Sequence, residues 1–252
     1  IAWLAYPGTT GLGAMDYRIS DPFLDPPSAE ALHYAERTLT LPNTFWCYDP
    51  LTHQPETTPP PVLARGHVTF GCLNHFCKVN PGVIALWAQV LAEVEGARFL
   101  LQAPPGAARQ RTLALFAQHG VDRERIAFTD RLERAQYLAL YQGIDVVLDC
   151  VPYNGHTTSL DAFWMGVPVV TLVGDTVVGR AGLSQCHNLD LTELVAHTPE
   201  QFVTIATNLS RDLPRLSHLR QNLRARLEAS PLMDASGFTR DLEHAYRQAW
   251  RR

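Results

Sequence analysis

Between residues 67 and 173 the chain alternates short apolar runs with amphipathic segments, and this alternation constrains its fold more than any other feature. A short apolar run is typical of a buried strand, and apolar residues at helical spacing predict an amphipathic helix. The expected strands are residues 67–73, 98–101, 126–129, 145–149 and 167–173, and the expected helices are 81–93, 107–119, 134–142 and 157–165. Alternating elements of this length form parallel βαβ units, so the sequence predicts an α/β fold with a doubly wound, Rossmann-like parallel sheet.

The flanking segments follow other patterns. Residues 1–6 and 15–19 predict strands, residues 21–28 a loop, and the Pro-rich residues 49–65 a semi-rigid linker. The C-terminal third predicts helices around 198–211, 215–229 and 237–251. Because the chain starts at Ile1 inside a strand-like run, we expect it to be a piece of a longer polypeptide.

Composition argues against several classes of function. The net charge of −4 does not suit nucleic-acid binding through bulk charge. Five cysteines without a C-x-x-C pair favour a reducing, cytoplasmic location over a disulfide scaffold. No apolar run is long enough for a membrane span, and the first residues lack the basic region of a signal peptide. No His or Asp residues have the spacing of a zinc or D-x-D site, so we expect no metal.

The most informative segment runs from Cys150 to Asp161, where a predicted strand gives way to a predicted helix. Doubly wound sheets bind ligands at the carboxyl ends of their strands, and a helix that starts there offers free N–H groups to an anion. His156, Thr157 and Thr158 add side-chain donors. Asp161 lies about one helical turn further on, within reach of a ribose hydroxyl. The segment therefore predicts a phosphate site; the alternative is that one Thr simply caps the helix.

Two further loops follow predicted strands. The first of these loops follows the predicted strand 67–73 and contains Lys78, the only lysine in the chain. An ammonium group suits a phosphate oxygen. A solvated surface lysine is the alternative. Arg134 and Tyr137 begin the helix after residue 129 and could stack on a base, although an exposed charged helix start explains them equally well.

Several motifs in this chain resemble the catalytic region of the O-linked N-acetylglucosamine transferases. The motifs are Tyr6-Pro7-Gly8-Thr9-Thr10-Gly11 with Met15-Asp16-Tyr17, Phe76-Cys77-Lys78-Val79-Asn80-Pro81, Asn154-Gly155-His156-Thr157-Thr158 with Asp161, Trp164-Met165-Gly166-Val167-Pro168-Val169-Val170-Thr171, and Ser230-Pro231-Leu232. The resemblance covers essentially the whole chain, in the same order, and is closest to bacterial members, which lack the insert between the catalytic halves found in animals.

The resemblance implies a GT-B architecture, in which two Rossmann-like domains hold a nucleotide-sugar between them. Residues 1–65 would be the tail of the first domain plus a linker, residues 66–236 the UDP-sugar-binding domain, and residues 237–252 a helix that packs back toward the first domain. The histidines of the first domain, and helical repeats that present protein acceptors, would lie upstream of Ile1.

The resemblance also implies a set of site residues. The expected UDP-binding residues are His75, Lys78, Leu101, Leu132, Arg134, Tyr137, His156, Thr157, Thr158 and Asp161, and the expected sugar-binding residues are Leu4, Cys77, Tyr153 and His156. Lys78 is the expected catalytic residue, holding the diphosphate, while Asp161 takes the ribose. Leu132 offers backbone groups to uracil. Cys77 and Tyr153 exchange the residue types usual in the family, and we expect them to line one N-acetyl pocket.

The implied activity is an inverting transfer of N-acetylglucosamine from UDP-GlcNAc to Ser or Thr hydroxyls of proteins. The implied partners are the donor, protein acceptors and the upstream domain, with no cofactor, metal, nucleic acid or membrane. We expect this chain alone to bind UDP but to turn over poorly, because half of the cleft is missing. Two alternatives stay open: another GT-B enzyme, such as a UDP-sugar epimerase or a small-molecule glycosyltransferase, and a non-catalytic nucleotide-sugar-binding module.

Overall fold

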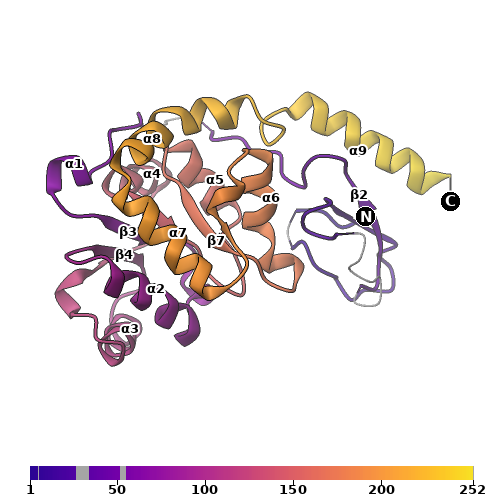
Figure 1. The fold of residues 1–252 in the computed structure, drawn as a ribbon. Coiled ribbons are helices and arrows are strands. Elements are labelled where there is room, and N and C mark those ends of the chain that lie inside the picture. Colours follow the sequence, from indigo (N-terminus) through magenta and orange to yellow (C-terminus); the bar gives the residue numbers. More distant parts are fainter. Residues whose placement is uncertain (5, 27–33, 52–54, 252) are drawn as a thin grey trace.

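The computed structural model describes residues 1–4, 6–26, 34–51 and 55–251. Its centre is a six-stranded parallel sheet in the order β5-β4-β3-β6-β7-β8 (Figure 1). The strands are β3 (Thr69–Cys72), β4 (Arg98–Gln102), β5 (Ile126–Thr129), β6 (Val146–Leu148), β7 (Val169–Leu172) and β8 (Val195–Ala196). The predicted doubly wound parallel sheet is confirmed.

Helices cover both faces of this sheet. The helices among the described residues are α1 (Val62–Arg65), α2 (Pro81–Glu93), α3 (Ala107–Gln118), α4 (Arg134–Leu140), α5 (Thr157–Trp164), α6 (Ala181–Asn188), α7 (Pro199–Arg211), α8 (Leu213–Glu228) and α9 (Ala235–Trp250), of which α9 lies away from this sheet. The chain enters at β3, moves outward to β5, and returns to β6 on the other side of β3. Right-handed crossovers therefore place α2 and α3 on one face and α4 and α5 on the other (Figure 1). The winding direction reverses between β3 and β6.

Local sequence signals set the helix starts. The Asn80 side chain accepts a hydrogen bond of 3.0 Å from the Val83 N–H, and Pro81 fills the first helical position of α2. Thr198 and Pro199 repeat this arrangement at α7. A capping side chain followed by proline is a favourable helix start, because proline has no N–H to leave unpaired. These signals explain why the predicted bounds of the two helices agree with the structure to within one residue.

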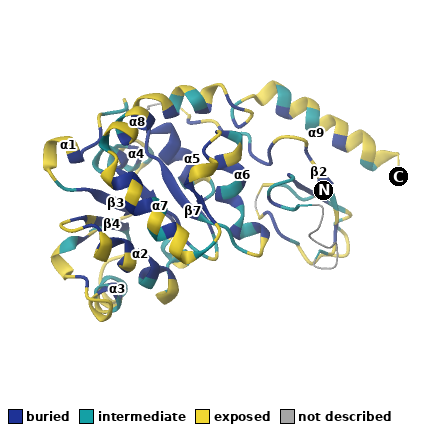
Figure 2. Cartoon of the chain, viewed as in Figure 1, coloured by how far each residue is buried: buried dark blue, intermediate teal, exposed yellow. Residues whose placement is uncertain are grey.

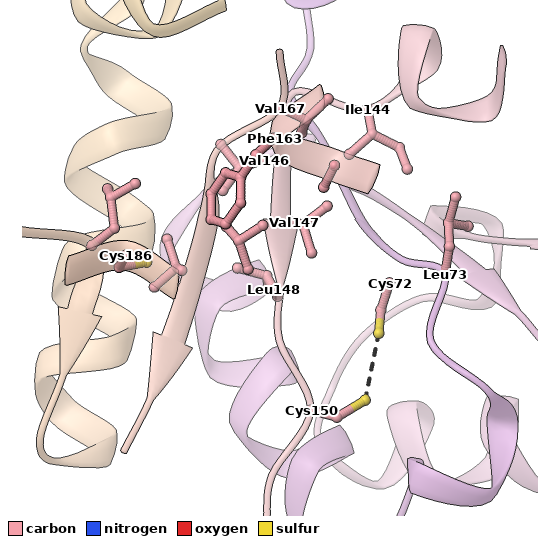
Figure 3. Packing of buried hydrophobic residues seen from close by; sticks show 14 of the residues in the cluster. Cys72, Leu73, Ile144, Val146, Val147, Leu148, Cys150, Phe163, Val167 and Cys186 are labelled. Carbon is pink, nitrogen blue, oxygen red and sulfur yellow. Dashed lines mark hydrogen bonds between the residues drawn. The ribbon is translucent and has the colours of Figure 1, made fainter. Parts of the chain in front are cut away.

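The hydrophobic core lies between the sheet and its helices (Figure 2). On one face, Trp87 of α2 lies 4.9 Å from Phe99 of β4, which lies 5.9 Å from Phe116 of α3. On the other face, Leu148 and Phe163 are buried where β6 meets α5 (Figure 3). Burying each such side chain contributes about 2 kcal/mol, so the core holds the central strands in place.

The described part of residues 1–50 forms a small unit beside the main body. Its strands, β1 (Tyr17–Ser20) and β2 (Arg37–Thr40), pair in parallel, and α9 lies over them (Figure 1). Trp3 stacks on Phe238 of α9 with ring centroids 5.1 Å apart. The Tyr17 hydroxyl donates to the Ala249 carbonyl at 3.4 Å. The last helix therefore packs on the N-terminal unit.

Asp21 fastens this unit to α6. Its fully buried carboxylate accepts hydrogen bonds from the Phe45 N–H at 2.9 Å and the Ser184 hydroxyl at 2.6 Å, and from the N–H groups of Phe23 and Leu24. Burial raises the pKa of Asp21, and these four donors oppose that shift. The carboxylate thus joins segments that are far apart in the sequence.

Several elements differ from the sequence prediction. The strand expected over residues 1–6 is wrong: Ala2 forms only an isolated bridge with Arg18, and Leu4 leaves the extended conformation with a φ of 70°. Residue 5, residues 27–28 of the expected loop and residues 52–54 of the expected linker lie outside the described residues. Helix α1 lies within the expected linker, so the linker prediction is wrong at its C-terminal end. Strands β2 and β8 and helix α6 were also not predicted, because they are short and lack a clear apolar period. None of the described helices has the length and apolar character needed to cross a bilayer.

Candidate functional site

Most of the expected site residues gather where the winding direction of the sheet reverses. Cys72 ends β3 and Cys150 follows β6, and their Sγ atoms lie 3.5 Å apart (Figure 3). The loops after these strands are therefore neighbours, and the loop after β5 lies on the same edge of the sheet. The carboxyl-end crevice at such a reversal is where open α/β sheets bind their ligands.

Two adjoining cavities lie at this edge. One, of about 490 Å³, is lined by Leu4, Trp46, Cys47, Tyr48, Asp49, Asn74, His75, Lys78, Tyr153, His156, Thr157, Thr158 and Leu160. The other, of about 610 Å³, is lined by Leu73, His75, Gln102, Arg131, Leu132, Glu133, Arg134, Tyr137, Thr157, Thr158 and Asp161. They share His75, Thr157 and Thr158, so these three residues stand at the junction between the cavities.

Lys78 reaches the first cavity from a short 3₁₀ turn, Phe76–Lys78. Its Nζ donates to the Asn154 carbonyl at 2.6 Å and lies 4.0 Å from the centroid of the Tyr153 ring. None of the ion pairs among the described residues includes Lys78. Burial lowers the pKa of Lys78, and the carboxylate of Asp149 opposes that shift. The ammonium is thus held by a carbonyl and a ring, which leaves its charge available to an anion.

Helix α5 presents its N-terminus to the same cavity. His156 precedes the helix, and no side chain caps it, so the alternative of a merely capping Thr is wrong. The Thr158 hydroxyl instead donates to the Asn74 Oδ1 atom. Gly155 is required just before this start, because a Cβ there would collide with the Ser159 and Thr158 hydroxyls. The uncapped first turn leaves N–H donors and the positive end of the helix dipole for a ligand.

His156 is a neutral imidazole at neutral pH. Burial, together with the nearby Lys78 ammonium, lowers the pKa of His156 to about 4. Its Nε2 atom is buried and has no hydrogen-bond partner in the structure. The ring lies 5.1 Å from Tyr153 and 5.8 Å from Trp46. The side-chain donor expected from the sequence is therefore a neutral imidazole near pH 7, not an imidazolium.

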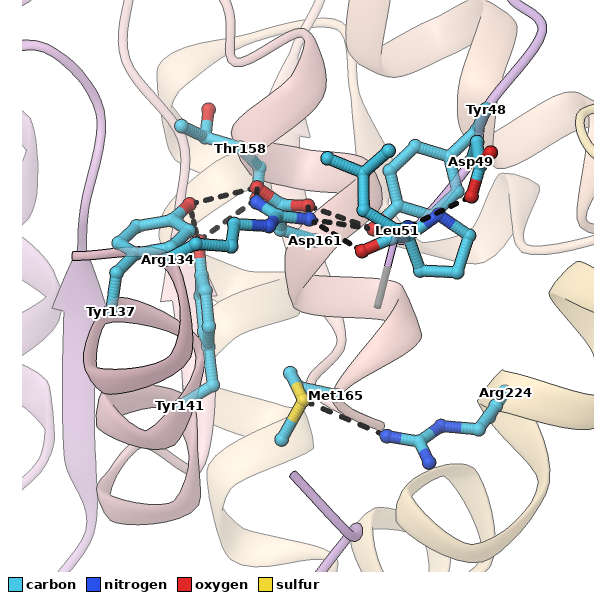
Figure 4. A network of polar contacts seen from close by, with 11 residues as sticks. Tyr48, Asp49, Leu51, Arg134, Tyr137, Tyr141, Thr158, Asp161, Met165 and Arg224 are labelled. Atoms are coloured by element: carbon cyan, nitrogen blue, oxygen red, sulfur yellow. Dashed lines mark hydrogen bonds and ion pairs between the residues drawn. The ribbon is translucent and has the colours of Figure 1, made fainter. Parts of the chain in front are cut away.

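Asp161 sits at the centre of a polar network on α5 (Figure 4). Its carboxylate is 2 % exposed and accepts two hydrogen bonds from the Arg134 guanidinium. The hydroxyls of Tyr48 and Tyr137 donate to it at 2.7 and 3.1 Å. The pKa values of both tyrosines are raised, first by burial and then by the Asp161 charge. The carboxylate expected to take a ribose hydroxyl thus already has four donors.

The other expected residues divide between the cavities. Leu4 and Tyr153 line the first cavity, while Leu132 lines the second. Cys77 lines a neighbouring cavity of about 570 Å³, so the structure does not bring it into the cavity of Tyr153. The Leu101 side chain is fully buried in the core and reaches none of these cavities. The next residue on the strand, Gln102, lines the second cavity in its place.

Some residues of the site had no assigned role in the sequence analysis. Trp46 and Tyr48 line the first cavity from the segment before the Pro-rich linker, and Asn74 follows β3 directly. The aromatic run Phe45-Trp46-Cys47-Tyr48 between two loops was the available signal for that segment. For Asn74, the signal was a polar residue directly after a buried strand.

The structure has a larger cavity elsewhere. It measures about 680 Å³, lies at the opposite ends of β3 and β4, and is lined in part by Arg65, His67 and Arg98, but by none of the expected site residues. Within residues 1–4, 6–26, 34–51 and 55–251, no group of three or more His, Cys, Asp or Glu side chains is placed to hold a metal ion. All five cysteines are free.

Comparison with known proteins places this chain in a family. A family profile described as "Glycosyl transferase family 41" matches residues 61–242. The probable UDP-N-acetylglucosamine–peptide N-acetylglucosaminyltransferase SPINDLY of Solanum lycopersicum is 38 % identical over 256 residues, which cover 100 % of this chain and 27 % of that protein. The corresponding probable transferase SEC of Arabidopsis thaliana is 28 % identical and covers 99 % of this chain and 26 % of that protein.

Solved structures agree with these sequence matches. An O-GlcNAc transferase mutant of Thermobaculum terrenum superimposes with a TM-score of 0.91 at 39 % identity, covering 99 % of this chain and 48 % of that one. A sucrose-phosphate synthase of Thermosynechococcus elongatus, at 14 % identity and a TM-score of 0.62, shares the fold alone. The chain thus spans about a quarter of the two named plant relatives and about half of the bacterial structure.

Proposed function

The chain belongs to glycosyl transferase family 41, and on that basis we propose that it carries the donor-binding part of an inverting protein O-glycosyltransferase. The donor is UDP-N-acetylglucosamine, and the acceptors are Ser and Thr hydroxyls of proteins. Residues 66–236 form the donor-binding domain. Residues 1–65 belong with an upstream catalytic domain, to which residues 237–252 pack back. The complete enzyme works in the cytoplasm and presents its acceptors on upstream helical repeats.

The observation that supports this proposal most directly is the position of the Lys78 ammonium beside the uncapped start of α5. Two sources of positive charge there face one cavity, as a diphosphate requires. The nucleoside then extends into the second cavity, where Leu132, Arg134 and Tyr137 flank the base and Asp161 meets the ribose. The sugar lies in the first cavity, near Leu4, Tyr153 and His156.

The reaction is a direct displacement at the anomeric carbon. The acceptor oxygen forms the new bond to that carbon, the bond to the β-phosphate oxygen breaks, and the acceptor proton leaves to a base of the upstream domain. Negative charge grows on the departing β-phosphate. Lys78 and the N–H groups at the start of α5 stabilise that charge, and each well-placed donor lowers the barrier by about 3 kcal/mol. His156, neutral at working pH, contributes a hydrogen bond rather than a charge.

Calorimetric titration of this chain with UDP tests the binding part of the proposal. We expect Lys78→Ala, and the double variant Thr157→Ala/Thr158→Ala, each to weaken binding at least tenfold. Arg98→Ala, in the cavity at the opposite ends of the strands, is the matched control and should bind like wild type. EDTA should leave the affinity unchanged, because the protein itself supplies the positive charge. Tighter binding of GDP than of UDP would overturn the assigned base.

Transfer is tested on the longer protein that includes the upstream domain, with UDP-N-acetylglucosamine and a Ser-containing acceptor peptide. We expect glycosylated peptide with inversion at the anomeric carbon, and loss of that product in Lys78→Ala. Epimerised or hydrolysed donor without glycopeptide would instead identify another GT-B enzyme. Binding without any turnover would identify a nucleotide-sugar-binding module. Full transfer by the isolated 252 residues would contradict the division of the site between two domains.

A further inference from the structure

Asp149 is hydrogen-bonded to both loops that form the proposed diphosphate site, yet it is fully buried and lines neither of the site's two cavities. A buried carboxylate is costly unless donors surround it. Its Oδ1 atom accepts hydrogen bonds from the Gly155 N–H at 2.6 Å, the Cys150 N–H at 2.8 Å and the Asn74 amide at 3.2 Å. Its Oδ2 atom accepts from the Thr171 hydroxyl at 2.9 Å.

These partners come from separate parts of the chain. Asn74 follows β3, Cys150 and Gly155 belong to the loop after β6, and Thr171 lies on β7. Asn74 in turn accepts a hydrogen bond from Thr158 at the start of α5. One carboxylate therefore ties together both loops that form the proposed diphosphate site. Burial raises the pKa of Asp149, and its hydrogen-bond donors together with the Lys78 charge oppose that shift. Since all of its hydrogen-bond partners donate, the ionised form is the one that this arrangement satisfies.

The charge of Asp149 also bears on Lys78. The charged and titratable groups around Lys78 are Asp149, His156, Cys72, Cys77 and Cys150, and Tyr153 presents its ring face. Asp149 is the carboxylic acid among them, and burial keeps the Cys150 thiol and the His156 imidazole in their neutral forms at neutral pH. Burial lowers the pKa of Lys78, and the charge of Asp149 makes the largest contribution that opposes this shift.

From these contacts we propose that Asp149 is a positioning residue: it fastens the loop after β3 to the loop after β6 and provides the Lys78 ammonium with a buried counter-charge. This inference rests on the proposed role of Lys78 in diphosphate binding. It adds a reason why a partly buried lysine stays charged before the donor arrives, with Asn154 and Tyr153 as its direct contacts.

Because Lys78 is the only lysine, its titration is measurable without any nucleotide. Acylation of Lys78 by an amine-reactive reagent, followed by mass spectrometry of its peptide from pH 6 to 11, reports the midpoint. Asp149→Asn keeps the shape, since the Asn oxygen serves the three donors on Oδ1 while its amide donates to Thr171. We expect this variant to move the Lys78 midpoint about one pH unit toward acid. Thr171→Val, which removes only the Oδ2 bond, should leave the midpoint unchanged.

UDP binding gives a second readout. At pH 6.5, Asp149→Asn should bind UDP with an affinity within about threefold of that of wild type. As pH rises, its UDP affinity should fall at a pH about one unit below that at which the wild-type affinity falls. Asn74→Ala breaks the link between the loops but keeps the charge of Asp149. It should therefore lower the UDP affinity at every pH without moving the titration midpoint of Lys78. An Asp149→Asn midpoint equal to that of wild type would overturn the counter-charge.

A measurement on the wild type covers the case in which Asp149→Asn fails to fold. The carboxyl ¹³C shift of Asp149 should report an ionised group at pH 7, and a protonated group there would overturn the inference. The Lys78 titration needs no nucleotide, so the two proposals fail separately. An Asp149-dependent midpoint in a chain that does not bind UDP would support this inference and reject the proposed function.

Discussion

The Arg134 guanidinium binds both carboxylate oxygens of Asp161, with Nη1 2.7 Å from Oδ2 and Nη2 2.6 Å from Oδ1 (Figure 4). Bidentate pairs of this kind fix both side chains in position. Asp161 is nearly fully buried, whereas the Arg134 side chain is 32 % exposed. The pair therefore forms a wall of the second cavity on which a nucleoside can rest, and a ligand that reaches Asp161 must share it with Arg134.

Replacing Asp161 by Asn should remove the proposed ribose contact. The variant keeps the shape but loses the charge that holds Arg134, so we expect UDP affinity to fall about tenfold. Titrating both UDP and 2′-deoxy-UDP separates the ribose contact from a general effect. Wild type should prefer UDP, and the variant should show a smaller preference. Tyr48→Phe removes one donor to the same carboxylate and serves as the control, with a change below about threefold. An equal preference in wild type would argue against the ribose role.

Gly155→Ala should disturb the start of α5. A Cβ at this position would collide with the hydroxyls of Ser159 and Thr158. Both residues lie in the first turn of α5, at the proposed phosphate site. We expect a loss of about 1–3 kcal/mol in the free energy of unfolding and at least a tenfold loss in UDP affinity. Gly13→Ala is the matched control, because nothing lies within 4 Å of a Cβ there and its φ is not positive. Normal UDP binding by Gly155→Ala would show that the helix start tolerates displacement.

His156 should make the free energy of unfolding depend on pH in the acid range. Its pKa is about 4 in the folded chain and 6.5 as the ordinary value, so the unfolded chain takes up the proton first as pH falls. The stability is fully present above pH 6.5 and is lost as pH falls toward 4, by about 3 kcal/mol. Urea unfolding of wild type and His156→Asn at pH 7 and pH 4.5 measures the difference. The variant should lose less stability over this interval, and parallel losses would contradict the low pKa.

Asp21→Ala should loosen the N-terminal unit. The substitution leaves the buried N–H groups of Leu24 and Phe45, and the half-buried N–H group of Phe23, without their acceptor. Each of these groups that water cannot reach costs about 1–3 kcal/mol. We expect a marked fall in the midpoint of chemical unfolding. Ser184→Ala removes only the contact with α6 and should cost about 1 kcal/mol. If the two variants unfolded at the same denaturant concentration, Asp21 would act mainly through Ser184 and not through the backbone.

Local sequence patterns accounted for the parallel sheet and for the places where its loops meet. Helix α2 and strand β5 agree with the predicted bounds because their patterns are complete within the segment itself: a cap with proline for α2, and a short apolar run for β5. Leu101 shows the limit of such reading. The family resemblance implied a ligand contact for Leu101, but side chains alternate along a strand, and this one points into the core and is fully buried.

By itself, the sequence determined the alternation of strands and helices, and hence that Lys78, Arg134 and Thr157 follow strands on one edge of a parallel sheet. Helical spacing and strand length are local properties, so a single chain carries them in its residue order. Only the tertiary structure decided that Tyr48 and Arg134 share Asp161, and that Asp149 joins the two loops under Lys78. Arg134 and Tyr48 lie 27 and 113 positions from Asp161 in the sequence. Asp149 accepts hydrogen bonds from donors in three separate segments of the chain. A buried carboxylate is stable only when donors surround it, and folding brings those donors from distant segments of the chain. No local sequence pattern specifies which donors they are.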